Sequence, residues 1–268
     1  MSTTTQLLVS TSPVVGSPRY TLLVAQQQTE VHAAQRLRHH VFADEMGAVL
    51  HSSQPGRDVD EFDAHCDHLV VREDSTGEIV GTYRMLPPEG ARCAGRLYCE
   101  TEFAIPGLVE LREALVETGR SCVHPDHRTG AVVSLVWAGI ARYMLLTGYR
   151  WLVGCASVPL RSPGAPDGAL AVGVWETVRA RYLAPERYRA APHRPWDVGA
   201  APGSRPTTLP PLLRGYLRLG AWVCGPPAYD PDFDVADFLV LLSLDRTDPR
   251  YLSHFLGHVL GHALGQRR

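Results

Sequence analysis

The sequence predicts a mixed α/β protein in which helices flank one sheet. Three observations carry this prediction. Apolar residues follow a helical period over residues 29–46, two strand patterns are joined by a turn at residues 74–78, and residues 150–158 form a continuous apolar run. Such a run is typical of a strand buried on both faces, as occurs where helices cover both sides of a sheet.

The elements of the first half follow from this periodicity. Residues 20–24 predict a first strand, and residues 29–46 a helix with Thr29 as N-cap and Gly47 as C-cap. Residues 67–74 and 78–86 form the two strands of a hairpin. Residues 115–124 predict a further strand, because proline at position 125 ends the pattern.

The second half alternates in the same way. Residues 134–146 predict a helix before the apolar strand in the sequence, and residues 169–183 predict one after it. Residues 210–225 and 235–244 predict a further helix and strands. We predict a flexible tail over residues 1–18, an α/β domain over 19–183, a Pro/Ala/Arg-rich connection over 184–211 and a C-terminal extension over 212–268 that packs on the core.

Composition excludes several classes of function. With 26 basic and 28 acidic residues the net charge is -2, which argues against nucleic acid as a partner. The chain contains no lysine, so Schiff-base and P-loop lysine chemistry are excluded. No basic segment precedes an N-terminal apolar stretch, and six cysteines form no C-x-x-C pair. We therefore expect a cytoplasmic protein without a metal site, and the apolar run at residues 131–146 is too short to span a membrane.

The C-terminal residues present a row of histidines. His254, His258 and His262 repeat every four residues and share one face of a predicted helix. Glycines repeat with the same step, which favours close helix packing over metal binding. The apolar side of this helix (Leu252, Phe255, Leu256, Val259 and Leu260) has three alternative roles: core, homodimer interface or contact with a membrane surface.

Charged residues interrupt the apolar elements between residues 38 and 122. Arg38 lies on the first helix, Arg84 inside a strand of the hairpin and Arg120 inside the strand after it. Asp60 and Asp63 lie in the preceding loop, and Glu117 accompanies Arg120. Buried charges require partners, and a paired network beside a cleft is what recognition of a charged small molecule requires.

Five motifs give the chain a family resemblance. The segments "LRHHVFADEMGA", "RDVDEFDAHCDHLVV", "GTYRML", "GRSCVHPDHR" and "GCAS", in this order, closely resemble the ornithine-lipid N-acyltransferases of the GNAT superfamily. The spacing of the charged residues also resembles that of the acyl-homoserine lactone synthases. The resemblance covers about residues 30–160. It implies a GNAT or acyl-homoserine-lactone-synthase-like fold with a C-terminal extension.

The resemblance implies long-chain N-acylation of the α-amine of ornithine or a similar amino acid, giving a lyso-aminolipid. Glu117 would act as the base, with Arg120 beside it. The acceptor would be bound by Arg38, Phe42, Asp60, Asp63 and Arg84. The donor, a 3-hydroxyacyl phosphopantetheine thioester, would meet Ser121, Cys122, Val123, Arg128, Gly130, Ala156 and Ser157, and no separate cofactor is implied.

The donor loop favours acyl carrier protein as the partner. Arg128 and Gly130 match the superfamily's pyrophosphate loop, but Val132 and Val133 replace small residues. This departure suits a donor with a single phosphate rather than a coenzyme A thioester, which remains the alternative. A basic docking patch for the carrier protein is expected among Arg128, Arg142, Arg150 and Arg161.

Several alternatives stay open at this point. An acyl-homoserine lactone synthase or another N-acyl amino acid synthase is the second enzymatic reading. A module that binds acyl chains or acyl carrier protein without catalysis is the third. Cys122 or Cys155 could carry the acyl group covalently, and His124 or His127 could assist proton transfer.

Overall fold

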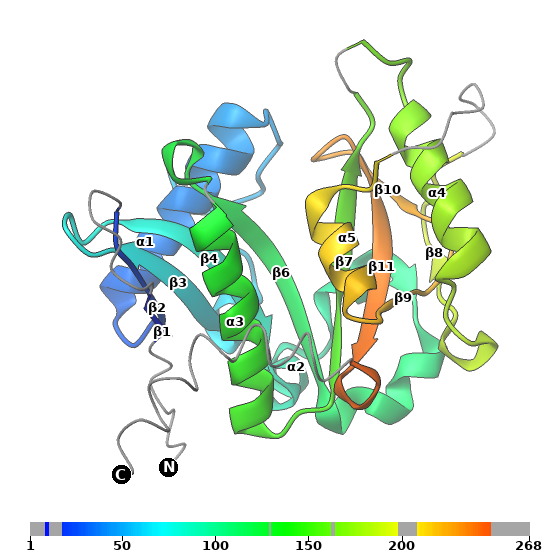
Figure 1. The fold of residues 1–268 in the computed structure, drawn as a ribbon, viewed down its shortest axis with the longest axis horizontal. Coiled ribbons are helices and arrows are strands. Elements are labelled where there is room, and N and C mark those ends of the chain that lie inside the picture. The colour runs from blue at the N-terminus through cyan, green and yellow to red at the C-terminus, as the bar shows by residue number, and fades with distance from the viewer. Residues whose placement is uncertain (1–8, 11–17, 129, 162–163, 198–207, 248–268) are drawn as a thin grey trace. The chain divides into compact units, whose positions relative to one another are not determined.

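The computed structural model of the protein describes residues 9–10, 18–128, 130–161, 164–197 and 208–247. The chain divides into two compact units (Figure 1). The first comprises residues 1–86, 119–149 and 249–268, and the second residues 87–118 and 150–248. Each unit therefore combines segments that are distant in the sequence. The second unit includes the end of the predicted α/β domain, the predicted connection of residues 184–211 and the start of the predicted extension.

The first unit is built on antiparallel strands that lie in the sheet in chain order. They are β1 (Val9–Ser10), β2 (Tyr20–Val24), β3 (Asp67–Glu73) and β4 (Ile79–Leu86), followed by β6 (Leu115–Val123). β2 pairs with β3 from Tyr20↔Glu73 to Val24↔Leu69. The β3–β4 hairpin is the one that the sequence predicts.

Helices cover both faces of this sheet. Leu22 of β2 faces α3 (Gly130–Thr147), where a Cβ atom on Gly139 would lie 2.6 Å from its Cδ2. The next residue, Leu23, packs with Ala34 of α1 (Gln28–His39). Because successive residues of a strand point to opposite faces, α1 and α3 lie on opposite sides, with α3 in front in Figure 1.

Helix α3 departs from the prediction about membrane spans. Its 18 residues have a mean hydropathy of 1.5, so by length and composition it is able to cross a membrane, whereas the sequence led us to exclude a span. The helix begins at Gly130, four residues before the predicted start at residue 134, so it is about one turn longer at this end than the predicted helix. Over half of it is buried in the fold, and Tyr143 donates to Asp67 of β3 at 2.7 Å, so α3 is a packed helix of the first unit.

The second unit has β7 (Trp151–Pro159) at its centre. β7 pairs along its length with antiparallel β11 (Val235–Ser243), all of whose residues are buried. On the other edge of β11 lie β9 (Trp222–Val223) and β10 (Ala228–Asp230). The unit also contains α2 (Pro88–Ala94), α4 (Ala169–Arg181), α5 (Pro211–Arg218) and the pair of β5 (Phe103–Ala104) with β8 (Ala191–Pro192).

Strand β6 contributes to both units. Its first residues pair in parallel with β7, from Leu115↔Trp151 to Thr118↔Gly154. A Cβ atom on Gly154 would lie 2.5 Å from the Thr118 carbonyl oxygen, so only glycine permits this approach. Arg120, in the part of β6 that belongs to the first unit, has φ +53°, a conformation that costs free energy in a residue with a Cβ.

The mixed α/β class is confirmed, and the differences are local. α1 has Gln27 rather than Thr29 at its N-cap, because the Glu30 carboxylate accepts the N–H groups of Gln26 and Gln27. The predicted helix to residue 46 changes at residue 40 into a π-helix, η1 (His40–Glu45), and Gly47 follows with φ +74°. The predicted tail contains β1, and the predicted connection contains β8. The helix of residues 252–262 lies outside the described residues.

Candidate functional site

The first unit contains a buried ring of alternating charges. Arg38, on α1, has no exposed surface. Its Nε lies 2.9 Å from an oxygen of Asp58, and its Nη2 donates to both oxygens of Asp63 at 2.8 and 2.9 Å. The six members of the ring are Arg38, Asp58, Arg120, Asp60, Arg84 and Asp63.

The other two arginines close the ring. Nη1 of Arg84, on β4, donates to Asp60 at 2.6 Å and lies 3.5 Å from Asp63. Arg120, on β6, lies 3.3 Å from Asp58 through Nε and 3.5 Å from Asp60 through Nη2. Each aspartate therefore contacts two arginines, and each arginine two aspartates. This is the compensation that makes burial of six charges tolerable.

The loop that carries the aspartates is fixed by its own hydrogen bonds. Asp60 Oδ1 accepts the backbone N–H groups of Phe62 at 2.9 Å and Asp63 at 3.1 Å. Asp63 Oδ2 in turn accepts the N–H of Asp60 at 2.9 Å. Short polar side chains that bind nearby backbone N–H groups stabilise turns of this kind, so the acidic half of the ring is set by its local sequence.

Electrostatic interactions within the ring favour the ionised form of Asp60. Burial opposes ionisation of Asp60, but Arg84, Arg120 and Arg38 outweigh it and lower the pKa of Asp60 to about 2. His68, on β3, shows the opposite balance: burial lowers its pKa to about 4, and its Nε2 lies 3.2 Å from the Asp63 carbonyl oxygen. His68 is thus neutral near pH 7 and leaves the charge balance of the ring unchanged.

Exposure separates two members of the ring from the rest. The side chains of Asp60 and Arg120 are 20% and 16% exposed, whereas those of the other four are at most 5% exposed. Phe42 of η1, another predicted acceptor residue, is also buried. Within the ring, a ligand could therefore reach only the side chains of Asp60 and Arg120 directly, whereas those of Arg38, Asp63 and Arg84 are buried.

Glu117 lies in the second unit and is 5% exposed. Its carboxylate accepts the backbone N–H of Tyr98, and of Cys99 at 2.7 Å. Those residues begin the 3₁₀ turn η3 (Tyr98–Thr101). Glu117 therefore holds this turn, a structural contact that the sequence does not reveal.

The predicted donor residues of the first unit lie at the end of β6 and beyond it. Cys122 is buried, and burial raises its pKa to about 12. Arg128 forms an ion pair with Glu45 of η1. At the start of α3, Val132 is fully buried against Gly81, while Val133 is 44% exposed. The two valines therefore differ, and only Val133 presents its side chain at the helix surface.

In the second unit, Ala156 and Ser157 lie on β7 opposite Phe238 and Asp237 of β11. Ala156 is buried, and Ser157 is exposed. Cys155, beside them, has its pKa raised well above the usual value by burial and by Glu102. Since a thiol reacts as its thiolate, neither Cys155 nor Cys122 has the environment of a covalent acyl carrier.

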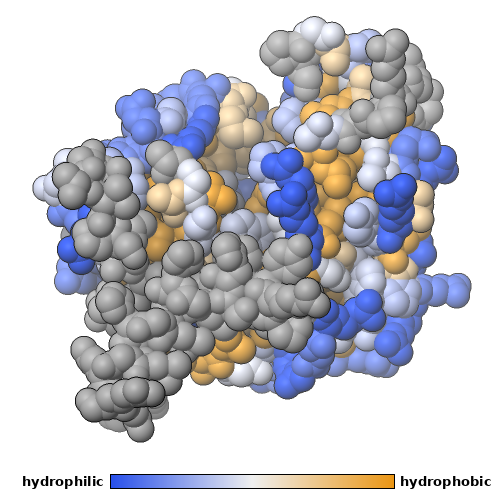
Figure 2. Space-filling view, viewed as in Figure 1, coloured by the Kyte–Doolittle hydropathy of each residue, from blue (hydrophilic) through white to orange (hydrophobic). Residues whose placement is uncertain are grey.

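The predicted basic patch consists mainly of paired arginines. Arg150 contacts Asp245, Arg161 lies 2.9 Å from Asp234, and Arg128 is held by Glu45. Hydrophilic residues are spread over the face that Figure 2 shows rather than gathered at one place. Three of the four arginines that the sequence suggested for this patch are therefore already engaged in ion pairs.

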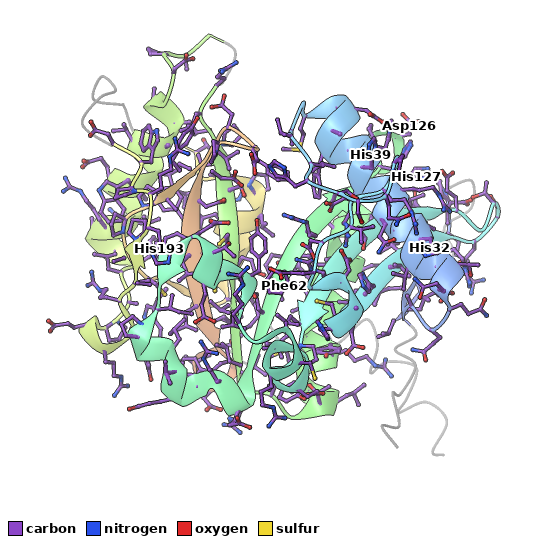
Figure 3. All side chains as sticks on the ribbon, turned by 180° about the vertical axis from the view of Figure 1, so that it is seen from behind. His32, His39, Phe62, Asp126, His127 and His193 are labelled. Atoms are coloured by element: carbon purple, nitrogen blue, oxygen red, sulfur yellow. The ribbon has the colours of Figure 1, made fainter. Side chains whose placement is uncertain are left out.

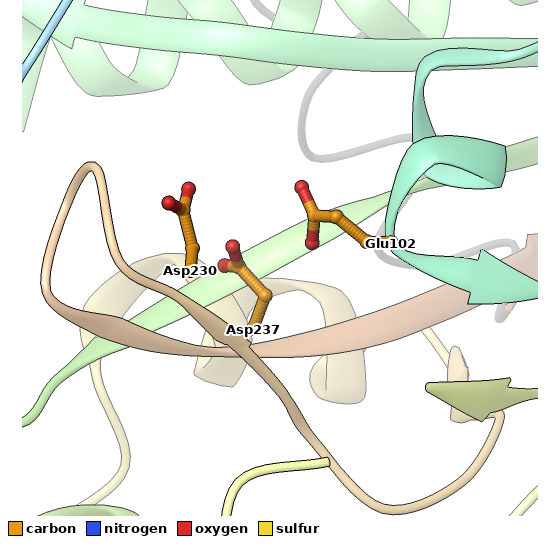
Figure 4. Close-up of side chains that lie close together, drawn as sticks. All are labelled: Glu102, Asp230 and Asp237. Atoms are coloured by element: carbon orange, nitrogen blue, oxygen red, sulfur yellow. The ribbon is translucent and has the colours of Figure 1, made fainter. Parts of the chain in front are cut away.

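A second cluster, in the second unit, is partly buried and entirely acidic. Glu102, Asp230 and Asp237 place ligand atoms within 4.8 Å of one another (Figure 4). Burial and the charges of Asp237 and Asp230 raise the pKa of Glu102 to about 9, so Glu102 is protonated near neutral pH. Cys155 Sγ lies 3.7 Å from Glu102. Oxygen ligands of this type suit a divalent cation, although an ion would have to displace this proton, and the sequence predicted no metal here.

Two features of the site were missed by sequence reasoning. Asp58 belongs to the ring, but it is one of several acids in "RDVDEFD" and its burial could not be told from its neighbours. The acidic cluster was missed because Glu102 lies more than a hundred residues before Asp230 and Asp237 and shares no motif with them. The other five members of the ring were predicted, and the structure brings them together.

The comparisons with known proteins place the chain among the acyltransferases of the GNAT class. Residues 37–138 match the family model described as an acetyltransferase (GNAT) domain. A solved structure of a CoA-dependent acyl-homoserine lactone synthase, BjaI, aligns with a TM-score of 0.51 at 15% identity, covering 95% of this chain and 89% of that one. An N-acyl amino acid synthase from uncultured soil microbes, FeeM, aligns with a TM-score of 0.50 at 12% identity, covering 87% and 94%. These likenesses show the fold.

Sequence relatives narrow the class. The L-ornithine N(alpha)-acyltransferase of Rhizobium meliloti (strain 1021) is 36% identical over 247 residues, which cover 87% of this chain and 82% of the relative. That of Agrobacterium fabrum (strain C58 / ATCC 33970) is 36% identical over 251 residues, covering 87% and 83%. The chain belongs to the family of L-ornithine N(alpha)-acyltransferases, and is an amide-forming acyltransferase.

Proposed function

We propose that this protein transfers a long-chain, 3-hydroxylated acyl group from acyl carrier protein to the α-amine of ornithine, giving a lyso-aminolipid. The relatives named L-ornithine N(alpha)-acyltransferase support the acceptor. The observation that carries the proposal is the ring of charges, which presents one carboxylate and one guanidinium, those of Asp60 and Arg120, at its partly exposed side.

These two groups match the charges of an amino acid with a cationic side chain. A carboxylate suits an ammonium group, and a guanidinium binds a carboxylate through charge-assisted hydrogen bonds. Because Asp60 and Arg120 are already held by Arg84 and Asp58, the acceptor would meet preformed groups and little ordering would be needed on binding. Arg38, Arg84 and Asp63 act in this proposal as positioning residues.

The chemistry requires a neutral amine. Its nitrogen attacks the thioester carbonyl carbon, the C–N bond forms, the C–S bond breaks, and the proton of the amine passes through a base to the leaving thiolate. We retain Glu117 as the base, acting through one water, because the N–H groups of Tyr98 and Cys99 fix the orientation of its carboxylate on the strand that also carries Arg120. Backbone N–H groups of Ser121 to Val123 are proposed to stabilise the oxyanion.

The donor proposal rests on the segment that precedes α3. Arg128 and Gly130 would bind a phosphate together with Ser121, Cys122 and Val123, and Ala156 and Ser157 of β7 would flank the pantetheine arm. Val133 occupies exposed surface in the first turn of α3, where a bulky side chain leaves less room for a pyrophosphate. This supports acyl carrier protein over coenzyme A as the donor, and we expect the reaction to take place in the cytoplasm.

The test is thiol release from 3-hydroxyacyl carrier protein with a panel of free amino acids, with the same acyl group on coenzyme A alongside. We expect release that depends on ornithine and is faster with the carrier protein. Release with another amine would replace the acceptor. Donor binding without release would contradict the enzyme proposal and favour a binding module.

Substitution of Glu117 tests the proposed base. If Glu117 takes the proton, Glu117→Gln should lower kcat about 10²–10⁴-fold and remove the acidic limb of the pH–rate profile. If Glu117 only holds η3, the variant should lose stability, since an amide group would face two N–H donors, while the shape of the pH profile stays that of the unmodified protein. Thermal unfolding and a pH profile of kcat separate these results.

A further inference from the structure

Arg128 is held by a carboxylate from a distant segment of the chain. Nη1 and Nη2 of Arg128 donate to the two oxygens of Glu45, both at 2.6 Å. Nε of the same guanidinium donates to the Val123 carbonyl oxygen at 3.2 Å. All three nitrogens of Arg128 are therefore engaged, in the two-pronged geometry that a phosphate would otherwise use.

The π-helix η1 is what brings Glu45 to this position. A π-helix is a rare local widening of an α-helix that is frequent at functional sites. Its first residue, His40, stacks on His124 with ring centroids 5.5 Å apart, and its last residue is Glu45. Figure 3 shows Asp126 and His127 beside the end of α1 that carries His39. The segment of residues 124–128 is thus tied to both ends of η1.

We propose that Glu45 is a residue that sets donor specificity, because it occupies Arg128 and thereby disfavours coenzyme A thioesters relative to acyl carrier protein. This inference rests on the proposed function, and it assigns the choice between the two donors to Glu45, a residue for which the resemblance implied no role. The pair is accessible to a ligand, since the side chains of Arg128 and Glu45 are 46% and 35% exposed.

Charge explains the direction of the effect. The phosphopantetheine arm of a carrier protein has one phosphodiester, whereas coenzyme A has a pyrophosphate and a further phosphate on its ribose. The Arg128–Glu45 ion pair has no net charge, so it gives no net electrostatic attraction to either donor. The more highly charged donor loses most, because it must displace the carboxylate or lie close to it. The hydrogen bond from Arg128 lowers the pKa of Glu45, so this carboxylate is ionised near neutral pH.

Asp44 provides a matched control. It precedes Glu45 in η1 and is 57% exposed, but its carboxylate lies 3.3 Å from His40 and 3.7 Å from His39 rather than near Arg128. Asp44→Asn and Glu45→Gln therefore remove the same charge from the same helix. Only Glu45→Gln frees the guanidinium.

The first experiment is equilibrium binding of coenzyme A and of pantetheine, which has no phosphate, to the unmodified protein and both variants. We expect Glu45→Gln to lower the Kd of coenzyme A roughly three- to tenfold and the Kd of pantetheine to stay the same. Asp44→Asn should change neither, and high salt should reduce the gain. Arg128→Gln added to Glu45→Gln should abolish it.

The second experiment compares donors in turnover. The ratio of kcat/KM for acyl coenzyme A to that for acyl carrier protein should rise in Glu45→Gln. An unchanged ratio and Kd, equal effects of both variants, or weaker coenzyme A binding by Glu45→Gln would overturn the inference. The last result would mean that Glu45 orients Arg128 for the donor. Absence of N-acylation by the unmodified protein with either donor would instead contradict the proposed function, and the binding experiment would still decide the role of Glu45.

Discussion

The two units of this protein shift the pKa values of desolvated carboxyl groups in opposite directions. In the first unit, three aspartates alternate with three arginines in a closed ring, and the pKa of Asp60 is lowered to about 2. In the second, Glu102, Asp230 and Asp237 lie close to one another, and burial together with the charges of the two aspartates raises the pKa of Glu102 to about 9. The same side chain chemistry is ionised in one place and protonated in the other.

The comparison teaches that partners, more than burial, decide the charge state. Desolvation raises the pKa of both Asp60 and Glu102, and only the neighbouring charges differ in sign. A balanced ring can therefore present fixed charges to a ligand. A cluster of acids must retain a proton, and at pH values above the unfolded-state pKa retaining that proton lowers the stability of the folded state.

The largest effect is expected from breaking the ring at its most buried member. Arg38→Met leaves Asp58 and Asp63 with one arginine each in a buried setting, which should cost roughly 3–5 kcal/mol and lower Tm by about 6–20 °C. Arg19→Gln, which removes an exposed partner of Asp74, is the control and should cost at most about 1 kcal/mol. Equal melting temperatures for the two variants would show that the ion pairs of Arg38 contribute no more to stability than an exposed ion pair does.

Removing the buried acid of the second unit should stabilise the protein. The pKa of Glu102 is raised in the folded state, so its contribution is fully present below its unfolded value near 4.5 and is lost as pH rises through about 9. Glu102→Gln should therefore raise the stability by roughly 1–3 kcal/mol at pH 8 and leave it unchanged at pH 4. Urea unfolding at both pH values measures this, with exposed Glu110→Gln as control. Destabilisation at pH 8 would mean that the carboxylate is ionised and paired there.

Asp60 should give a smaller effect in the opposite pH range. Its pKa is lowered in the folded state, so its contribution is present above the unfolded value of 3.8 and is lost as pH falls toward about 2. We expect the unmodified protein to lose roughly 1–2 kcal/mol more than Asp60→Asn between pH 5 and pH 2.5. Parallel losses in urea unfolding would show that Asp60 is not held by Arg84 and Arg120.

Much of the ring could be predicted from the sequence, because charged residues inside apolar patterns must find partners. Arg38, Arg84 and Arg120 stand out for this reason. Asp58 does not, since loop acids are ordinarily solvated. The positive φ of Arg120 could not be predicted either, because no glycine or asparagine marks it.

The elements that the sequence missed depend on contacts between distant segments. The π-helix η1 continues the apolar period of α1, so nothing in the pattern separates it from an α-helix. The ion pair of Glu45 with Arg128 joins two exposed side chains far apart in the sequence. The acidic cluster combines Glu102 with two acids of the C-terminal half. Sequence periodicity predicts the secondary structure of each segment, but it does not predict which segments contact one another in the fold.

The central claim is that the exposed side of the ring binds the amino acid acceptor, and steady-state kinetics with ornithine and acyl carrier protein test it most directly. Asp60→Asn should raise the KM for ornithine about tenfold or more, the loss expected for a charge-assisted hydrogen bond, with the KM for the donor unchanged. Glu61→Gln, the next acid in the chain and an exposed one, should leave both constants unchanged. A raised KM for ornithine in Glu102→Gln together with an unchanged one in Asp60→Asn would place the acceptor at the acidic cluster and contradict the account.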